Sequence, residues 1–187
     1  MAIRSQIGDP WTIAVSRANL AALSLEEGQP AAAEALARQA SEELRKLKAN
    51  RDLAVTYSVL ARSLLEQGKT SEARSVIQTA QELSARTDEI PVHFEVDIAG
   101  ARVGAAEVNH YHQGQTAAPK QTLEGVLAQA TRHGYLGYQF QARLALGEVD
   151  MASDNAGAGR ARLATLEKDA EAKGFGLIAR KAARVNR

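Results

Sequence analysis

Two histidines in the stretch NHYHQG are the first residues of this sequence that could hold a metal ion. His110 and His112 stand two positions apart, and a helix would place their side chains about 200° apart around its axis. Two helical ligands for one ion need neighbouring positions such as i and i+4. His93, in PVHFEVD, has no second histidine at such a spacing. We therefore predict no metal site.

The residue types that could act in catalysis also lack partners. Gly157 and Gly159 in NAGAGRAR suggest a phosphate-binding loop, but no Lys-Ser/Thr pair follows them and no strand is predicted before them. No serine lies in a G-x-S-x-G turn, and the absence of cysteine excludes a thiol nucleophile. The carboxylate pairs at 26–27 and 42–43 are ordinary on solvated helix faces. We predict no catalytic residue, no cofactor and no enzyme activity.

The balance of charge argues against nucleic-acid and membrane partners. The 187 residues include 23 Lys and Arg against 22 Asp and Glu, and the two signs are interleaved along the chain. The start, MAIRSQIGDPW, lacks the apolar run of a secretory signal, and no later stretch is apolar enough to span a bilayer. Together with the absence of cysteine, this predicts a cytoplasmic protein.

The elements that must position any site are revealed by an internal repeat. A glycine recurs at 28, 68 and 114, and an aspartate takes its place at 154, so that the intervals are 40, 46 and 40 residues. A small or compact residue stands five positions after each of these markers: Ala33, Ala73, Pro119 and Gly159. Such a period indicates a stacked array of similar units, each of which buries its apolar face against its neighbours.

Each unit has the pattern of a helical hairpin. Before the marker at 68, apolar residues recur in steps of three and four at Leu53, Tyr57, Leu60 and Leu64. After it, the same period continues at Ala73, Ile77 and Ala80. The glycine between them can take the left-handed conformation that ends a helix, because it has no Cβ to clash with the backbone. The small residue five positions later lets the two helices approach closely.

These signals predict nine helices. We expect them near 11–27, 30–49, 52–67, 71–86, 91–112, 117–133, 136–152 and 157–173, with a capping helix at 175–185. Gly134 and Gly174 stand where C-caps are expected. The turn signal TDEIP at 87–91 is expected to absorb most of the six extra residues of the third unit. An array needs neighbours to cover its ends, so we expect this chain to be part of a longer protein.

Several of these positions resemble the tetratricopeptide repeat. The family's pattern is met in the second unit by Leu60, Ala61, Gly68, Ala73, Ile77 and Ala80, and in the first by Leu20, Ala21, Gly28, Ala33 and Ala40. The chain departs from the family in two respects: only Tyr57 keeps the aromatic residue that opens each first helix, and the period exceeds the usual 34 residues. The longer unit resembles the arrays appended to bacterial signalling proteins, including serine/threonine kinases, nucleotide cyclases and ATP-dependent transcriptional regulators.

The resemblance implies an all-α, right-handed superhelix. It would consist of about four helix-turn-helix units, near 11–49, 52–86, 91–133 and 136–173, followed by the capping helix, so that residues 1–187 form a single repeat domain. In this family the first helices of the units line a concave groove. The positions that would bind a partner there are Arg62, Leu65, Glu66, Val108, Tyr111, His112, Gln141, Glu148 and Met151. The alternative is that several of these residues pack between units.

The predicted groove is mostly apolar with a few polar tips, which suits a peptide or an amphipathic helix. Only Arg62 among the lining positions is cationic, so the carboxylate clamp of chaperone-binding family members is not implied. We expect a protein-interaction scaffold or sensor arm of a bacterial signalling protein. The alternatives are self-assembly through the array ends, small-ligand sensing that regulates an attached kinase or transcription-regulator domain, a nucleic-acid-binding helical repeat, and an enzyme.

Overall fold

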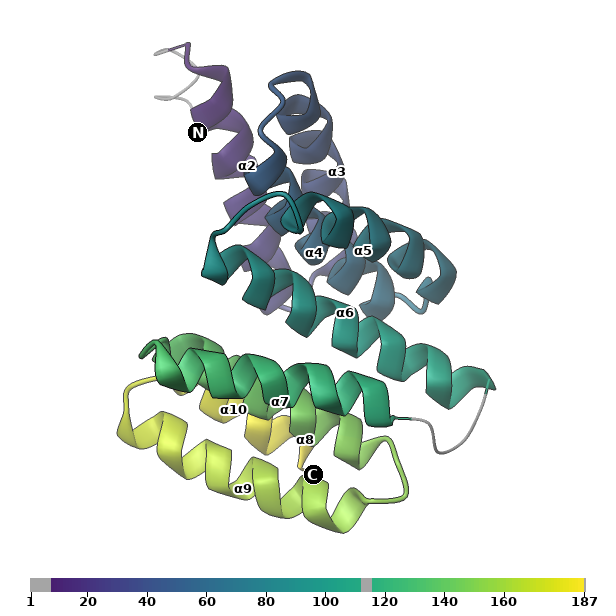
Figure 1. The fold of residues 1–187 in the computed structure, drawn as a ribbon, viewed down its shortest axis with the longest axis vertical. Helices are drawn as coiled ribbons and strands as arrows, with labels where there is room; N and C mark the ends of the chain where they lie inside the picture. Colours follow the sequence, from purple (N-terminus) through teal and green to yellow (C-terminus); the bar gives the residue numbers. More distant parts are fainter. Residues whose placement is uncertain (1–7, 112–115, 187) are drawn as a thin grey trace. The chain divides into compact units, whose positions relative to one another are not determined.

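The computed structural model describes residues 8–111 and 116–186, with side chains for all of these except 108–111. In these ranges the chain is all α-helical and forms nine helices (Figure 1). Their bounds are α2 (Pro10–Glu26), α3 (Pro30–Lys46), α4 (Asn50–Glu66), α5 (Thr70–Ser84), α6 (Ile90–Tyr111), α7 (Ala117–Arg132), α8 (Leu136–Met151), α9 (Ala156–Ala172) and α10 (Gly176–Val185).

The predicted all-α fold of successive helical hairpins is confirmed. Each expected helix is present, with ends that differ from the prediction by no more than about three residues, a normal uncertainty for helix boundaries. The prediction for the turn at 87–91 is wrong. Ile90 and Pro91 begin α6, which has 22 residues against 17 in α4, so most of the extra length of the third unit is helical.

The described marker glycines end the first helix of their hairpins, as predicted, while the third marker, Gly114, lies outside the described residues. Gly28 and Gly68 have φ of 75° and 73°. In the turn at Gly68, the amide of Lys69 bonds the carbonyl oxygen of Leu64 at 2.9 Å, so the chain reverses while the last carbonyl groups of α4 keep a partner. Gly134 and Gly174 also take the left-handed conformation, at the ends of α7 and α9.

The chain divides into two compact units, which are larger than the repeats: the first extends to Val103 and the second begins at Gly104. From here on, the first and second unit mean these two parts of the chain. In the first compact unit, the hairpins α2–α3 and α4–α5 pack together, and Gly100, in the middle of α6, lies against Ile77 and Gln81 of α5. Its core is built largely from alanine and leucine, with Ala61 and Ala73 both fully buried. Because alanine side chains are short, helix axes can approach closely at these positions.

In the second unit, α7 packs on α8, α8 on α9, and α10 on both α8 and α9, as expected of a capping helix. Its apolar core gathers Phe140, Leu144, Leu163, Leu166, Ala170, Ala179 and Ala182. Phe175, just before α10, packs edge-on against Phe140 with ring centroids 5.0 Å apart. This aromatic contact anchors the last helix to the hairpin before it.

One carboxylate in the second unit is buried between two cations. Asp150 of α8 is 3% exposed. Its oxygens lie 2.7 Å from Nζ of Lys120 on α7 and 3.2 Å from Nε of Arg162 on α9. A buried carboxylate needs such compensation, so these ion pairs hold three successive helices together.

Candidate functional site

The first helices of the first two hairpins, α2 and α4, lie against one another. Three of the predicted groove residues are on α4: Arg62, Leu65 and Glu66. Their spacing of three and four positions places them on one face of the helix. The structure therefore brings these three residues together, on the α4 face that we call the α4 row.

Arg62 is joined to the neighbouring hairpin. Its Nη2 donates to Oε1 of Glu26 on α2 at 2.9 Å, and the two side chains are 17% and 25% exposed. A guanidinium has five N–H donors, so a single bond to Glu26 does not use all of them. The α4 row thus contains a partly buried ion pair that spans two successive first helices.

The other two members of the α4 row differ in exposure. Leu65 is half-buried and packs against the core cluster of the first unit. Glu66, the next residue, is exposed. Leu65 is therefore partly a packing residue, as the alternative interpretation expected, and only a portion of its side chain remains accessible to a partner.

Three of the predicted groove residues belong to the fourth repeat and share one face of α8. Gln141, Glu148 and Met151 stand seven and three positions apart, and each is half-buried. Met151 packs against the core cluster of its unit, and its Cγ lies 3.0 Å from the point where a Cβ on Gly159 would be. Met151 is therefore at least partly a packing residue between α8 and α9.

The remaining three predicted groove residues lie outside the described side chains. Val108 and Tyr111 belong to α6, and His112 follows it, but the structure describes no side chain for any of them. Their assignment to a partner-binding face stays a prediction from the repeat.

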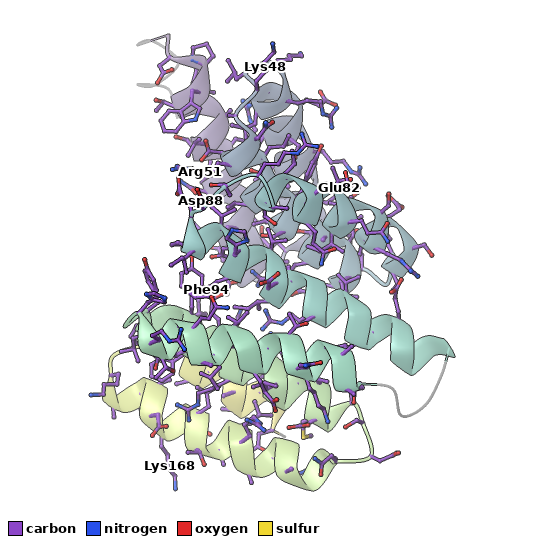
Figure 2. All side chains as sticks on the ribbon, in the orientation of Figure 1. Lys48, Arg51, Glu82, Asp88, Phe94 and Lys168 are labelled. Carbon is purple, nitrogen blue, oxygen red and sulfur yellow. The ribbon has the colours of Figure 1, made fainter. Side chains whose placement is uncertain are left out.

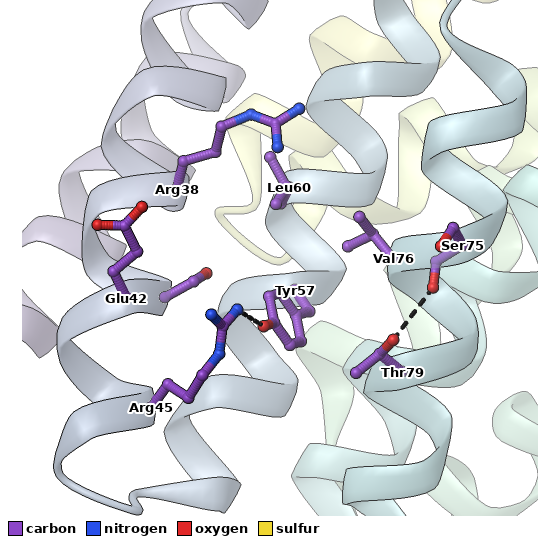
Figure 3. Close-up of a pocket in the computed structure, with 9 residues that line it drawn as sticks. Arg38, Glu42, Arg45, Tyr57, Leu60, Ser75, Val76 and Thr79 are labelled. Carbon is purple, nitrogen blue, oxygen red and sulfur yellow. Dashed lines mark hydrogen bonds between the residues drawn. The ribbon is translucent and has the colours of Figure 1, made fainter.

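One concave feature of the structure was not predicted from the sequence. It is a pocket of about 230 Å³ between α3, α4 and α5, which we call the α3–α5 pocket (Figure 3). Four of its lining residues come from α3, two from α4 and three from α5: Arg38, Ser41, Glu42, Arg45, Tyr57, Leu60, Ser75, Val76 and Thr79. The sequence pattern identified Tyr57 only as an aromatic residue of the repeat. No local signal connects it to α3 and α5.

A network of charges fixes α3 relative to α5 beside this pocket. Glu34 of α3 accepts hydrogen bonds at 2.8 Å from Lys69, Arg38 and Gln67. The bond from Lys69 is the main reason that the pKa of Glu34 falls from 4.5 to about 2, with further lowering by Arg38 and Gln67 against an opposing effect of burial. Arg38 also donates to Glu72 at 2.9 Å.

Of the residues considered for metal binding, His110 and His112 lie outside the described side chains, and His93 has another partner. Nε2 of His93 lies 2.8 Å from the carbonyl oxygen of Thr87, so this ring ties α6 to the turn before it. Burial raises the pKa of the neighbouring Asp97, and His93 partly opposes that rise. Over the described part of the chain, no group of three or more His, Cys, Asp or Glu side chains could hold a metal ion.

Gly159 is explained by packing, since it lies buried at the crossing of α8 and α9. Within 8–111 and 116–186, no helix has both the length and the hydrophobicity to cross a bilayer. A scan of the sequence against models of known protein families finds no match, and a search of curated protein sequences finds none either.

Proposed function

We propose that this chain is a protein-interaction module of the tetratricopeptide kind, serving as a scaffold or sensor arm of a bacterial signalling protein. Its partner would be a peptide or a helix bound along the first helices of the hairpins. The observation that carries this proposal is the α4 row, where Arg62 and Glu26 form a partly buried ion pair between successive first helices, beside the accessible part of Leu65.

The chemistry of the α4 row suits a polar, extended or helical protein segment. Arg62 retains N–H donors for carbonyl or carboxylate groups, and Glu66 offers an exposed acceptor. Arginine is enriched among the residues that dominate binding energy at interfaces, while exposed rim charges contribute little. We therefore expect Arg62 to contribute more to affinity than Glu66.

The overall charge supports a protein partner over a nucleic acid. A formal net charge of +1 is low for a surface that neutralises several phosphates. The absence of a nucleophile–base arrangement in the sequence likewise supports a binding role over an enzyme. A cytoplasmic location fits the same proposal.

The test begins with selection of peptides that bind the whole chain from a random display library. Affinities of the best peptide are then measured by fluorescence polarisation for the wild type, Arg62→Ala, Leu65→Ala and Tyr111→Ala, the last chosen from the repeat alone. Arg62→Ala should weaken binding by roughly tenfold or more. The matched control is Arg86→Ala, which removes an exposed arginine at the end of α5 and should change affinity by less than about twofold.

Selected peptides that bind equally to the wild type and to all three groove variants would show that the partner uses another face. Loss of helical circular dichroism in a variant would disqualify that variant. The remaining variants would still decide the question, since Arg62 and Leu65 lie on α4 and Tyr111 lies on α6.

A second candidate function, self-assembly, is favoured by the face of α2. Leu20 and Leu23 are 37% and 54% exposed on this helix. Burying both in a second copy would remove apolar surface from water. Sedimentation velocity should then show a dimer that Leu23→Ser abolishes, and a monomer at all concentrations would exclude it.

A further inference from the structure

The α3–α5 pocket contains an arginine whose charge is not balanced by an ion pair. Arg45 of α3 donates from Nη2 to the hydroxyl oxygen of Tyr57 on α4 at 2.6 Å (Figure 3). Among the described residues, no carboxylate lies within ion-pair distance of Arg45. The other arginine of the pocket, Arg38, is already bound by Glu34 and Glu72. Arg45 is exposed and interacts with the charge of Glu42 on the same helix without forming an ion pair, so its guanidinium is the one in this pocket that can still pair with a ligand.

Tyr57 is placed to donate to the same ligand. Its ring is held by burial, since the residue is only 8% exposed. The hydroxyl oxygen accepts from Arg45, which leaves the hydroxyl proton for another acceptor. Within the described part of the chain no acceptor for that proton is present. The guanidinium and the phenol together form two adjacent donors whose positions are fixed by one hydrogen bond.

The opposite wall of the pocket adds a hydroxyl group and apolar surface. Ser75 and Thr79 come from α5, and the hydroxyl of Thr79 donates to the carbonyl oxygen of Ser75 at 3.2 Å. The Ser75 hydroxyl has no partner among the described residues. Leu60 and Val76 supply the apolar part of the lining (Figure 3). Such a site offers donors at one end and room for a few methylene groups beside them.

We propose that the α3–α5 pocket binds a carboxylate carried on a short aliphatic stem, with the Arg45 guanidinium and the Tyr57 hydroxyl as its donors. The ligand is a small aliphatic monocarboxylate or the side chain of a glutamate in a peptide, which share this chemistry. Arginine and carboxylate are complementary in shape and form charge-assisted hydrogen bonds. The proposal does not depend on the α4 row, because no residue of that row lines the pocket.

The repeat supplies an internal comparison for this site. Counted from the markers, the fourth-unit counterpart of Leu60 is Leu146, and that of Ala73 is Gly159. The counterparts of the polar pocket residues are different: Thr131 for Arg45, Arg143 for Tyr57 and Ala161 for Ser75. The hairpins therefore pack without this set of donors, and packing alone does not account for Arg45, Tyr57 and Ser75.

Glu42 should weaken the binding of a carboxylate in this pocket. It lines the pocket on α3 and carries a negative charge that opposes an incoming carboxylate. The pocket is small, and Glu42 already offsets part of the Arg45 charge, so we expect a dissociation constant on the order of 1 mM. Removing the charge of Glu42 should strengthen binding, whereas removing the charge of Arg45 should weaken it. The proposal therefore predicts opposite changes in affinity at two residues of one helix.

The experiment is a titration of the ¹⁵N-labelled chain, followed by amide chemical shifts. One arm adds sodium butyrate, a second adds an acetylated, amidated Ala-Glu-Ala peptide, and a third adds sodium chloride to the same ionic strength. We expect saturable shifts at the amides of Tyr57 and of residues 75–79 with one or both carboxylates and none with chloride. Binding of butyrate alone identifies a small carboxylate as the ligand, and binding of the peptide identifies a glutamate side chain.

The variants decide whether the proposed donors hold the ligand. Arg45→Gln should weaken binding by roughly tenfold, and Tyr57→Phe, which keeps the ring, by about threefold or more. Glu42→Gln should strengthen it by about twofold or more. The matched control is Lys46→Gln, which removes an equal charge from the next, exposed residue and should leave affinity within about twofold. Equal effects of Arg45→Gln and Lys46→Gln, or no saturable shift with either carboxylate, would overturn the proposal.

Discussion

The backbone nitrogen of Met151 stands 2.8 Å from the point where a Cβ on Gly159 would lie. Real Cβ atoms do not approach backbone atoms so closely. The start of α9 therefore rests directly on the end of α8, and only glycine allows it. Gly159 is the fourth of the small or compact residues that stand five positions after the repeat markers, so this close backbone approach falls on a position that the repeat itself identified.

Gly159→Ala should destabilise the second unit by about 1–3 kcal/mol, because the new methyl group must displace α8 or α9 and this cost exceeds the gain in helix propensity. The matched control is Gly157→Ala in the same helix, where nothing lies within 4 Å of the added Cβ. That change should stabilise the chain by about 0.5–1 kcal/mol. Urea unfolding followed by circular dichroism measures both, and the same sign for the two changes would contradict the described crossing.

Much of the fold follows from the sequence because its signals are local and repeated. Apolar residues every three or four positions mark the helices, and glycines mark their ends. The extra length of the third repeat was wrongly assigned to the turn at 87–91, because the proline there was taken as a turn signal, whereas it stands in the first turn of a longer α6. Proline is tolerated in the first turn of a helix, where its missing N–H has no intrahelical partner. Pro10 and Pro30 begin α2 and α3 in the same manner.

The contacts of the candidate sites could not be predicted in the same way, because they join residues far apart in the chain. The repeat pattern identified Arg62 as a groove residue but gave it no partner, and its described partner is Glu26 on α2. The Arg45–Tyr57 bond likewise joins α3 to α4, and the pocket is completed by α5. Such contacts depend on the lateral placement of hairpins, which periodicity does not specify.

Lys48, labelled in Figure 2, is the described non-glycine residue with positive φ, at 55°. It follows α3, where its amide bonds the carbonyl oxygen of Arg45 and the next amide bonds that of Leu44, as in a Schellman motif. Lysine pays a steric cost in this conformation that glycine avoids. Lys48→Gly should therefore raise the free energy of unfolding by about 0.5–1 kcal/mol.

The control for this prediction is Lys46→Gly, at the last residue of α3, which has ordinary helical geometry. It should lower the free energy of unfolding by roughly 0.5–1 kcal/mol, since glycine is a poor helix former. Thermal or urea unfolding of both variants gives the comparison. A destabilised Lys48→Gly would mean that the lysine side chain makes a contact that outweighs the backbone cost.

Stability should decrease at acidic pH through Glu34. Its folded-state pKa of about 2 lies below its ordinary value of 4.5. The stabilisation by its ion pairs is therefore fully present above about pH 4.5 and is lost as the pH falls toward 2. After allowance for solvent screening, we expect it to be on the order of 1–2 kcal/mol.

Glu34→Gln should remove this contribution. The variant should be less stable than the wild type at pH 7, and the difference should shrink as the pH falls toward 2. The matched control is Glu82→Gln, which removes an exposed carboxylate of α5. Urea midpoints of the three proteins between pH 2 and pH 7 provide the measurement. A constant difference between Glu34→Gln and wild type across that range would show that the ion pairs with Lys69 and Arg38 do not form in solution.

The Arg62–Glu26 pair should contribute to both stability and recognition, and a charge exchange separates the two. Arg62→Glu alone places like charges together between α2 and α4 and should cost about 1–2 kcal/mol of stability. Adding Glu26→Arg should restore most of that loss, because the pair re-forms with its ends reversed. If the α4 row binds the partner, the exchanged protein should fold normally yet bind the selected peptide roughly tenfold or more weakly. Normal stability together with unchanged affinity would assign this ion pair to the packing of the hairpins alone.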